Sequence, residues 1–188
     1  MGTKQSKKNL TENDIQMIEK HTGLSRNDIE NWHAAFILDC PSGTLNKEQF
    51  IRFYSDLYPD AAKAKTYSQY VFRAFDKDKS GYIDFCEFLI AFSIAGRQNT
   101  DRERITWIFN MYDTDHNGYI DRNEMIEMLD AIFDMLNVDR RALENTPEYR
   151  VQMIMTTLDR DMDDRISSEE FIDGVCKDNV IRKLLLPD

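Results

Sequence analysis

The stretch DTDHNGYIDRNE, from Asp113 to Glu124, determines the fold of this chain. It carries oxygen-bearing side chains at positions 1, 3 and 5, glycine at position 6, isoleucine at position 8 and glutamate at position 12. This spacing is typical of a loop that wraps one hard cation. Glycine suits position 6 because the sharp turn there needs a positive φ angle.

The same spacing recurs along the chain. DKDKSGYIDFCE spans Asp76–Glu87, DRDMDDRISSEE spans Asp159–Glu170, and a degenerate copy starts at Leu38, with Gly43 at position 6 and Gln49 at position 12. The four starts are 38, 37 and 46 residues apart. Apolar residues at helical spacing flank each loop. We therefore predict an all-α fold of four helix–loop–helix units in two EF-hand pairs, compact, two-lobed and calmodulin-like, with position 8 in short strands that join paired loops.

We expect the three intact loops to bind one Ca²⁺ each, and Mg²⁺ to occupy some of them when calcium is low. The ligands are the side chains at positions 1, 3, 5 and 12 and the carbonyl at position 7, while position 9 (Asp84, Asp121) acts through water. The predicted ligands are Asp76, Asp78, Ser80, Tyr82 and Glu87; Asp113, Asp115, Asn117, Tyr119 and Glu124; and Asp159, Asp161, Asp163, Arg165 and Glu170.

Two loops depart from the pattern. The last has Asp164 in place of glycine at position 6, which predicts binding with some backbone strain. The degenerate loop is predicted to be silent, because Leu38 cannot ligate, Pro41 stiffens the turn and Gln49 lacks the bidentate charge. Its Cys40 is too soft a ligand for calcium and is interpreted as a packed thiol.

The net charge of −10 is concentrated in these loops. The three intact windows together carry −9, so the other residues are almost neutral. Binding to nucleic acid phosphates is not expected of such a chain. The three histidines are scattered and form no acid–base set, so we predict no enzymatic activity.

The amino terminus fits an N-myristoylation pattern, with Gly2 as the acceptor and Ser6 four residues later. Lys4, Lys7 and Lys8 add a basic patch, the second signal that stable membrane attachment needs. We expect a cytoplasmic protein that associates reversibly with membranes. Three parts are predicted: an acylated arm and helix (1–24), a first loop pair with one active site (25–96) and a second pair with both sites active and a tail (97–188). The hinge is placed at 95–99.

Aromatic residues gather between residues 32 and 92, whereas methionines are concentrated after Met111. Calcium-sensing EF-hands open on binding and expose an apolar groove. Part of the aromatic set is therefore predicted to line a groove for a partner helix or the acyl chain.

The chain resembles the neuronal calcium sensor family over its full length. The resemblance rests on Gly2 with Ser6, the disabled CPSG loop after Asp39, three intact loops and Asn145–Glu148; the tail is most similar to the hippocalcin, visinin-like and frequenin branch. It implies calcium-driven extrusion of the acyl chain and targets such as receptor kinases, cyclases, lipid kinases or channels. The groove residues that it implies are Trp32, Phe36, Phe50, Phe53, Tyr54, Phe88 and Phe92.

The favoured hypothesis is thus a calcium sensor that regulates membrane-associated targets. Two alternatives stay open: a passive buffer, which needs neither anchor nor groove, and a regulatory subunit of the calcineurin B type. The silent first loop argues against the second alternative, which has four active loops. A homodimer also stays open.

Overall fold

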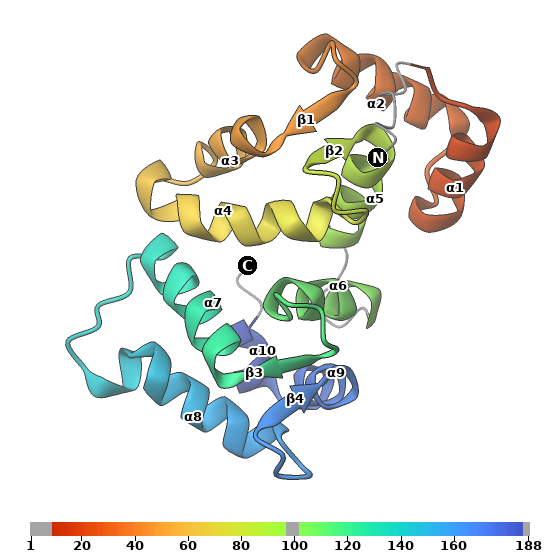
Figure 1. Ribbon diagram of the computed structural model, residues 1–188. Helices are drawn as coiled ribbons and strands as arrows, with labels where there is room; N and C mark the ends of the chain where they lie inside the picture. Colours follow the sequence, from red (N-terminus) through yellow and green to blue (C-terminus); the bar gives the residue numbers. More distant parts are fainter. Residues whose placement is uncertain (1–8, 97–101, 186–188) are drawn as a thin grey trace.

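The computed structural model describes residues 9–96 and 102–185. The first part contains α1 (Glu12–Thr22), α2 (Arg26–Asp39), β1 (Thr44–Asn46), α3 (Lys47–Ser55), α4 (Ala61–Phe75), β2 (Tyr82–Asp84) and α5 (Phe85–Ala95). The second contains α6 (Arg102–Tyr112), β3 (Tyr119–Asp121), α7 (Arg122–Met135), the 3₁₀ helix η1 (Leu143–Asn145), α8 (Pro147–Leu158), β4 (Arg165–Ser167), α9 (Ser168–Lys177) and α10 (Asn179–Leu185). The predicted fold of paired helix–loop–helix units is confirmed (Figure 1).

The loops are joined in pairs by two short antiparallel ladders. In β1–β2, Leu45 lies opposite Ile83, and in β3–β4, Ile120 lies opposite Ile166. All four residues occupy position 8 of their loops, and the three isoleucines are fully buried. The prediction that position 8 links paired loops is therefore confirmed.

The helices that leave the loops begin with capping boxes. Position 9 is the N-cap of each of these helices, and the residue at position 12 is its N3 residue. Such reciprocal hydrogen bonds satisfy backbone N–H groups that a helix start leaves unpaired. Helix α8 also begins with a favourable sequence, with Thr146 as N-cap and Pro147 at the first helical position.

Two hydrophobic clusters hold the described residues together. The larger runs from α3 and α4 through α6 and α7 to α8, α9 and α10, so it includes side chains of both halves. The smaller joins α1, α2 and α5 around Ile18, Ile29 and Leu89. Figure 1 shows α4 lying along α6 and α7, which is the main contact between the two halves.

Some predictions fall outside the described residues. These are the acylated Gly2 with its lysines and residues 97–99 of the hinge. Within the described residues, no helix is long and apolar enough to cross a membrane.

Candidate metal centres

Each intact loop gathers three carboxylates into one small volume. One oxygen from each lies within 4.8 Å of the others, and the groups are Asp76, Asp78 and Glu87; Asp113, Asp115 and Glu124; Asp159, Asp161 and Glu170. These residues are at positions 1, 3 and 12 of each loop, which are three of the five positions in each predicted ligand set. The donors are hard oxygens, the type that Ca²⁺ requires, so the sites fit this ion.

The first aspartate of each loop is fixed by backbone donors. In the second loop of the chain, Asp76 accepts the N–H groups of Ser80 and Gly81, both at 2.9 Å. The third and fourth loops repeat this arrangement around Asp113 and Asp159, with distances of 3.0 to 3.2 Å. Both oxygens of this residue are thus oriented by the backbone of its own loop.

The glutamate at position 12 bridges the two ends of its loop. Glu124 Oε1 accepts the N–H groups of Thr114 and Asp115, at 2.7 and 3.2 Å, and its Oε2 accepts that of Asp121 at 3.1 Å. Glu87 and Glu170 have equivalent partners at both ends. Position 12 is therefore placed where a carboxylate can close a loop around an ion.

Burial acts on these acids in different degrees. It raises the pKa of Glu87, although N–H groups of Asp84 and Asp78 oppose the shift. It also raises the pKa of Asp113 against donors from Gly118 and Asn117. Burial disfavours ionisation of Glu170 as well, but hydrogen bonds from Ser167 and Arg160 prevail and lower its pKa. A bound cation would compensate the desolvated charge at the first two residues.

Positions 5, 7 and 9 contact their own loop. Ser80 Oγ donates to the carbonyl of Tyr82 at 2.9 Å, and Asn117 Nδ2 donates to Asp115 at 3.0 Å. Asp163 is not among the three grouped acids of its loop, and its Oδ1 accepts the N–H of Arg165 at 2.9 Å. The remaining predicted position-7 ligand is Tyr119, whose N–H binds Asn117 at 2.8 Å. Asp84 and Asp121, predicted to act through water, cap the exit helices.

The backbone of the intact loops is left-handed at two positions. Positions 4 and 6 have positive φ in each, with values from 57° to 88°. Lys79, His116 and Met162 occupy position 4, and Asp164 (φ 68°) takes position 6 of the fourth loop. Asp164 thus adopts the turn that glycine makes elsewhere, as its position predicted.

The degenerate first loop has a different backbone. Helix α2 continues to Asp39, and Cys40 caps it by donating to the Phe36 carbonyl at 2.7 Å. Asp76 makes the same contact with Phe72, so the capping position comes two residues later in the first loop. Leu38 is still helical and 81% exposed. Pro41 stands where the intact loops have positive φ, which proline cannot adopt.

The predicted groove residues are partly core and partly surface. Phe36 and Phe50 are buried, Tyr54 and Phe88 are half-buried, and Trp32, Phe53 and Phe92 are exposed. Trp32 and Phe92 are in ring contact at 5.5 Å, and Phe88 stacks on Phe92 at 5.9 Å. The exposed rings of α2 and α5 therefore form one aromatic face.

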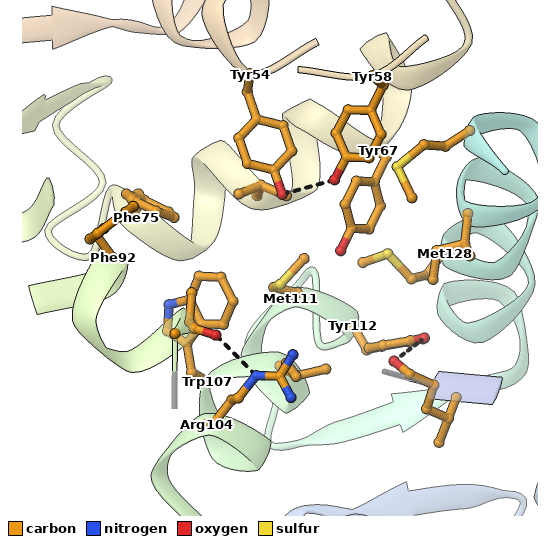
Figure 2. A pocket seen from close by; sticks show the side chains of 17 residues that line it. Tyr54, Tyr58, Tyr67, Phe75, Phe92, Arg104, Trp107, Met111, Tyr112 and Met128 are labelled. Carbon is orange, nitrogen blue, oxygen red and sulfur yellow. Dashed lines mark hydrogen bonds between the residues drawn. The ribbon is translucent and has the colours of Figure 1, made fainter. Parts of the chain in front are cut away.

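A cavity of about 290 Å³ lies between the two halves. Figure 2 shows Tyr54, Tyr58 and Tyr67 on one side of it and Trp107, Met111 and Met128 on the other. Burial raises the pKa of Tyr67. Of the predicted groove residues, Tyr54 and Phe92 line this cavity. No sequence signal points to the other residues that line the cavity, because the contact of α4 with α6 and α7 brings them together.

Two halves, each with a pair of loops, and three acidic loops that could each hold a cation define an EF-hand protein. The profile of the EF-hand domain pair matches residues 65–129 and 102–176. Neuronal calcium sensor 1 of Lymnaea stagnalis is 40% identical, covering 100% of this chain and 98% of its own. Human recoverin is 34% identical, with 94% and 89% covered. Guanylyl cyclase-activating protein 2 of Lithobates pipiens is 34% identical, with 86% and 83% covered.

The chain belongs to the neuronal calcium sensor family. Members of this family are calcium sensors that act as regulators and are not enzymes.

Proposed function

We propose that the chain binds Ca²⁺ at its second, third and fourth loops and, when loaded, regulates membrane-associated target proteins. The observation that carries this proposal is the presence of three clusters of three acids. In each cluster, one oxygen of every acid lies within 4.8 Å of the others, and backbone N–H donors orient the first aspartate. Converging acids repel one another without a cation, so a divalent ion would relieve the repulsion and order the loop. The fifteen predicted ligands given above complete the three sites, and Mg²⁺ fills some of them when calcium is low.

The same proposal assigns the aromatic face to a target helix. Calcium would shift the population toward a state that exposes more of this surface. Phe36 and Phe50 are buried here, so they would join the groove only in a conformation that uncovers them. Receptor kinases, cyclases, lipid kinases and channels are the target classes, and the name of guanylyl cyclase-activating protein 2 supports a cyclase among them.

Membrane attachment completes the proposal. A myristoyl group on Gly2, with the basic residues beside it, would anchor a cytoplasmic protein reversibly. We also propose that the chain divides into the three predicted parts, with boundaries at residues 24/25 and 96/97.

The decisive experiment is membrane sedimentation of acylated protein, with and without calcium. A Gly2→Ala variant, which cannot be acylated, is the matched control. We expect calcium-dependent sedimentation of the acylated form alone. Equal sedimentation of the acylated protein with and without calcium would support a permanent membrane anchor and would contradict a calcium-dependent switch. A titration with an apolar fluorescent probe then separates sensor from buffer, since a buffer exposes no new apolar surface on binding calcium.

A further inference from the structure

The fourth loop makes its turn at position 6 without glycine. Asp164 has φ 68°, and its N–H donates to Asp159 Oδ2 at 3.0 Å. Gly81 and Gly118 make the same contact in the other intact loops, at 2.9 and 3.0 Å. The fourth loop therefore keeps the common geometry, although a residue with a Cβ atom adopts a left-handed conformation less readily than glycine.

The carboxylate of Asp164 is held by an arginine of the neighbouring loop. Arg122 donates to Asp164 Oδ1 through Nε, at 3.0 Å, and its NH2 nitrogen lies 3.0 Å from the same oxygen. The NH1 group of Arg122 also donates to Gln152 of α8, at 2.9 Å. Because α8 leads into the fourth loop, Arg122 contacts both the entering helix and the turn of that loop.

The strand register explains why these two residues meet. Asp121 lies opposite Arg165 in the β3–β4 ladder. The next step of the same antiparallel register places residue 122 opposite residue 164. In the first half, Asn46 lies opposite Tyr82, and the next step places Lys47 opposite Gly81. Gly81 has no side chain that Lys47 could hold. Among the described residues, this ion pair therefore occurs beside the β3–β4 ladder and not at the corresponding place beside the β1–β2 ladder.

We propose that Arg122 is a positioning residue for the fourth loop. It holds Asp164 in the left-handed turn and so sets, from the third loop, the affinity of the fourth site for Ca²⁺. This inference rests on the proposed function, because it needs a fourth loop that takes calcium. Both side chains are well exposed, 39% for Arg122 and 71% for Asp164, so the effect is modest, about two- to fivefold in affinity.

The test compares three full-length proteins whose residues 122 and 164 together carry no net charge. They are the unchanged chain, an asparagine variant (Arg122→Met with Asp164→Asn) and a glycine variant (Arg122→Met with Asp164→Gly). Constant charge matters because a lone carboxylate or guanidinium would itself change calcium affinity. Each protein is titrated with CaCl₂ while NMR follows the backbone amides of residues 81, 118 and 164. These amides report the second, third and fourth loops separately.

We expect the asparagine variant to bind calcium at the fourth loop about two- to fivefold more weakly than the unchanged chain. The glycine variant should bind at least as tightly as the unchanged chain, because glycine needs no support in this turn. In metal-free protein, the residue-164 amide should exchange with solvent faster in the asparagine variant, after correction for intrinsic rates. The amides of residues 81 and 118 should titrate alike in all three proteins.

Equal affinity of the unchanged chain and the asparagine variant would overturn the inference. So would a glycine variant as weak as the asparagine variant, because Arg122 would then act through Gln152. If the residue-164 amide of the unchanged chain ignores calcium while residues 81 and 118 respond, the inference fails and calcium sensing by the other two loops stands. If all three amides ignore calcium, the proposed function itself fails.

Discussion

At the scale of single residues, the glutamate at position 12 serves two purposes in every intact loop. One of its oxygens caps the helix that follows, and the other accepts N–H groups from the start of the loop. Gln49 of the degenerate first loop keeps the cap, since its Oε1 accepts the N–H of Asn46 at 3.1 Å. The negative charge is thus dispensable for this cap, and we expect the cation to need it.

This separation predicts a specific effect of Glu170→Gln. The fourth site should lose affinity for Ca²⁺ by about ten- to a hundredfold, because one ligand loses its charge. The stability of the metal-free protein at neutral pH should fall only modestly, because glutamine can still cap α9 but loses the charge that the Ser167 and Arg160 hydrogen bonds stabilise. Calorimetric titration measures the first quantity and urea unfolding the second. The adjacent Glu169→Gln is the matched control, because Glu169 is exposed and outside the acidic group. Equal losses in both variants would contradict a specific role for position 12.

Gly174 supports a second prediction at this scale. A Cβ atom there would collide with Cδ2 of Leu158 and lie 3.3 Å from its Cγ, and Leu158 is itself buried. Gly174→Ala should therefore destabilise the protein by about 1–3 kcal/mol through overpacking of α9 on α8. Urea unfolding of metal-free protein measures the change.

The control for Gly174 is Gly96→Ala. A Cβ at residue 96 would meet only backbone oxygens at 3.6 Å or more, and the local φ is −78°. This variant should lose no stability. A Gly174→Ala protein as stable as the Gly96→Ala protein would show that Leu158 moves aside freely.

At the scale of whole elements, the sequence predicted most of what the loops do. The pairing of the loops through their position-8 residues is a local pattern and is confirmed, whereas the ligand sets stay predictions that the three acidic groups support. The silence of the first loop was predicted from its missing ligands. The two-residue extension of α2 was not, because helix ends depend on which capping contact forms, and Cys40 takes the contact that Asp76 makes elsewhere.

The extended α2 predicts that charge alone cannot repair the first loop. Gln49→Glu restores position 12, yet Leu38 stays in the helix and Pro41 cannot adopt a positive φ. The number of calcium ions bound, measured by calorimetry, should remain that of the unchanged chain. Glu87→Gln is the companion variant, and loss of one tight site there would show that the method resolves a single loop. One additional calcium in the Gln49→Glu protein would show that the backbone can rearrange.

At the scale of the whole molecule, contacts between residues far apart in the chain could not be predicted from the sequence. Trp107 Nε1 donates to the carbonyl of Ala74 at 3.2 Å, and Tyr70 donates to Glu127 at 3.5 Å, across the two halves. No local pattern encodes such pairs, since they depend on how α4 lies on α6 and α7. The two predicted halves accordingly share one large hydrophobic cluster.

Because the two halves share this cluster, a destabilising substitution in the core of one half is predicted to destabilise the other half as well. Met128 of α7 is fully buried and, like Tyr67 of α4, lines the cavity (Figure 2). Met128→Ala should destabilise the protein by about 2–5 kcal/mol and increase amide exchange in α4 as well as in α7. Ile29→Ala, in the smaller cluster, is matched in burial and size of truncation. It should increase exchange in α1, α2 and α5 and leave α7 protected. If Met128→Ala left the exchange of α4 unchanged, the two halves would open independently despite their common core.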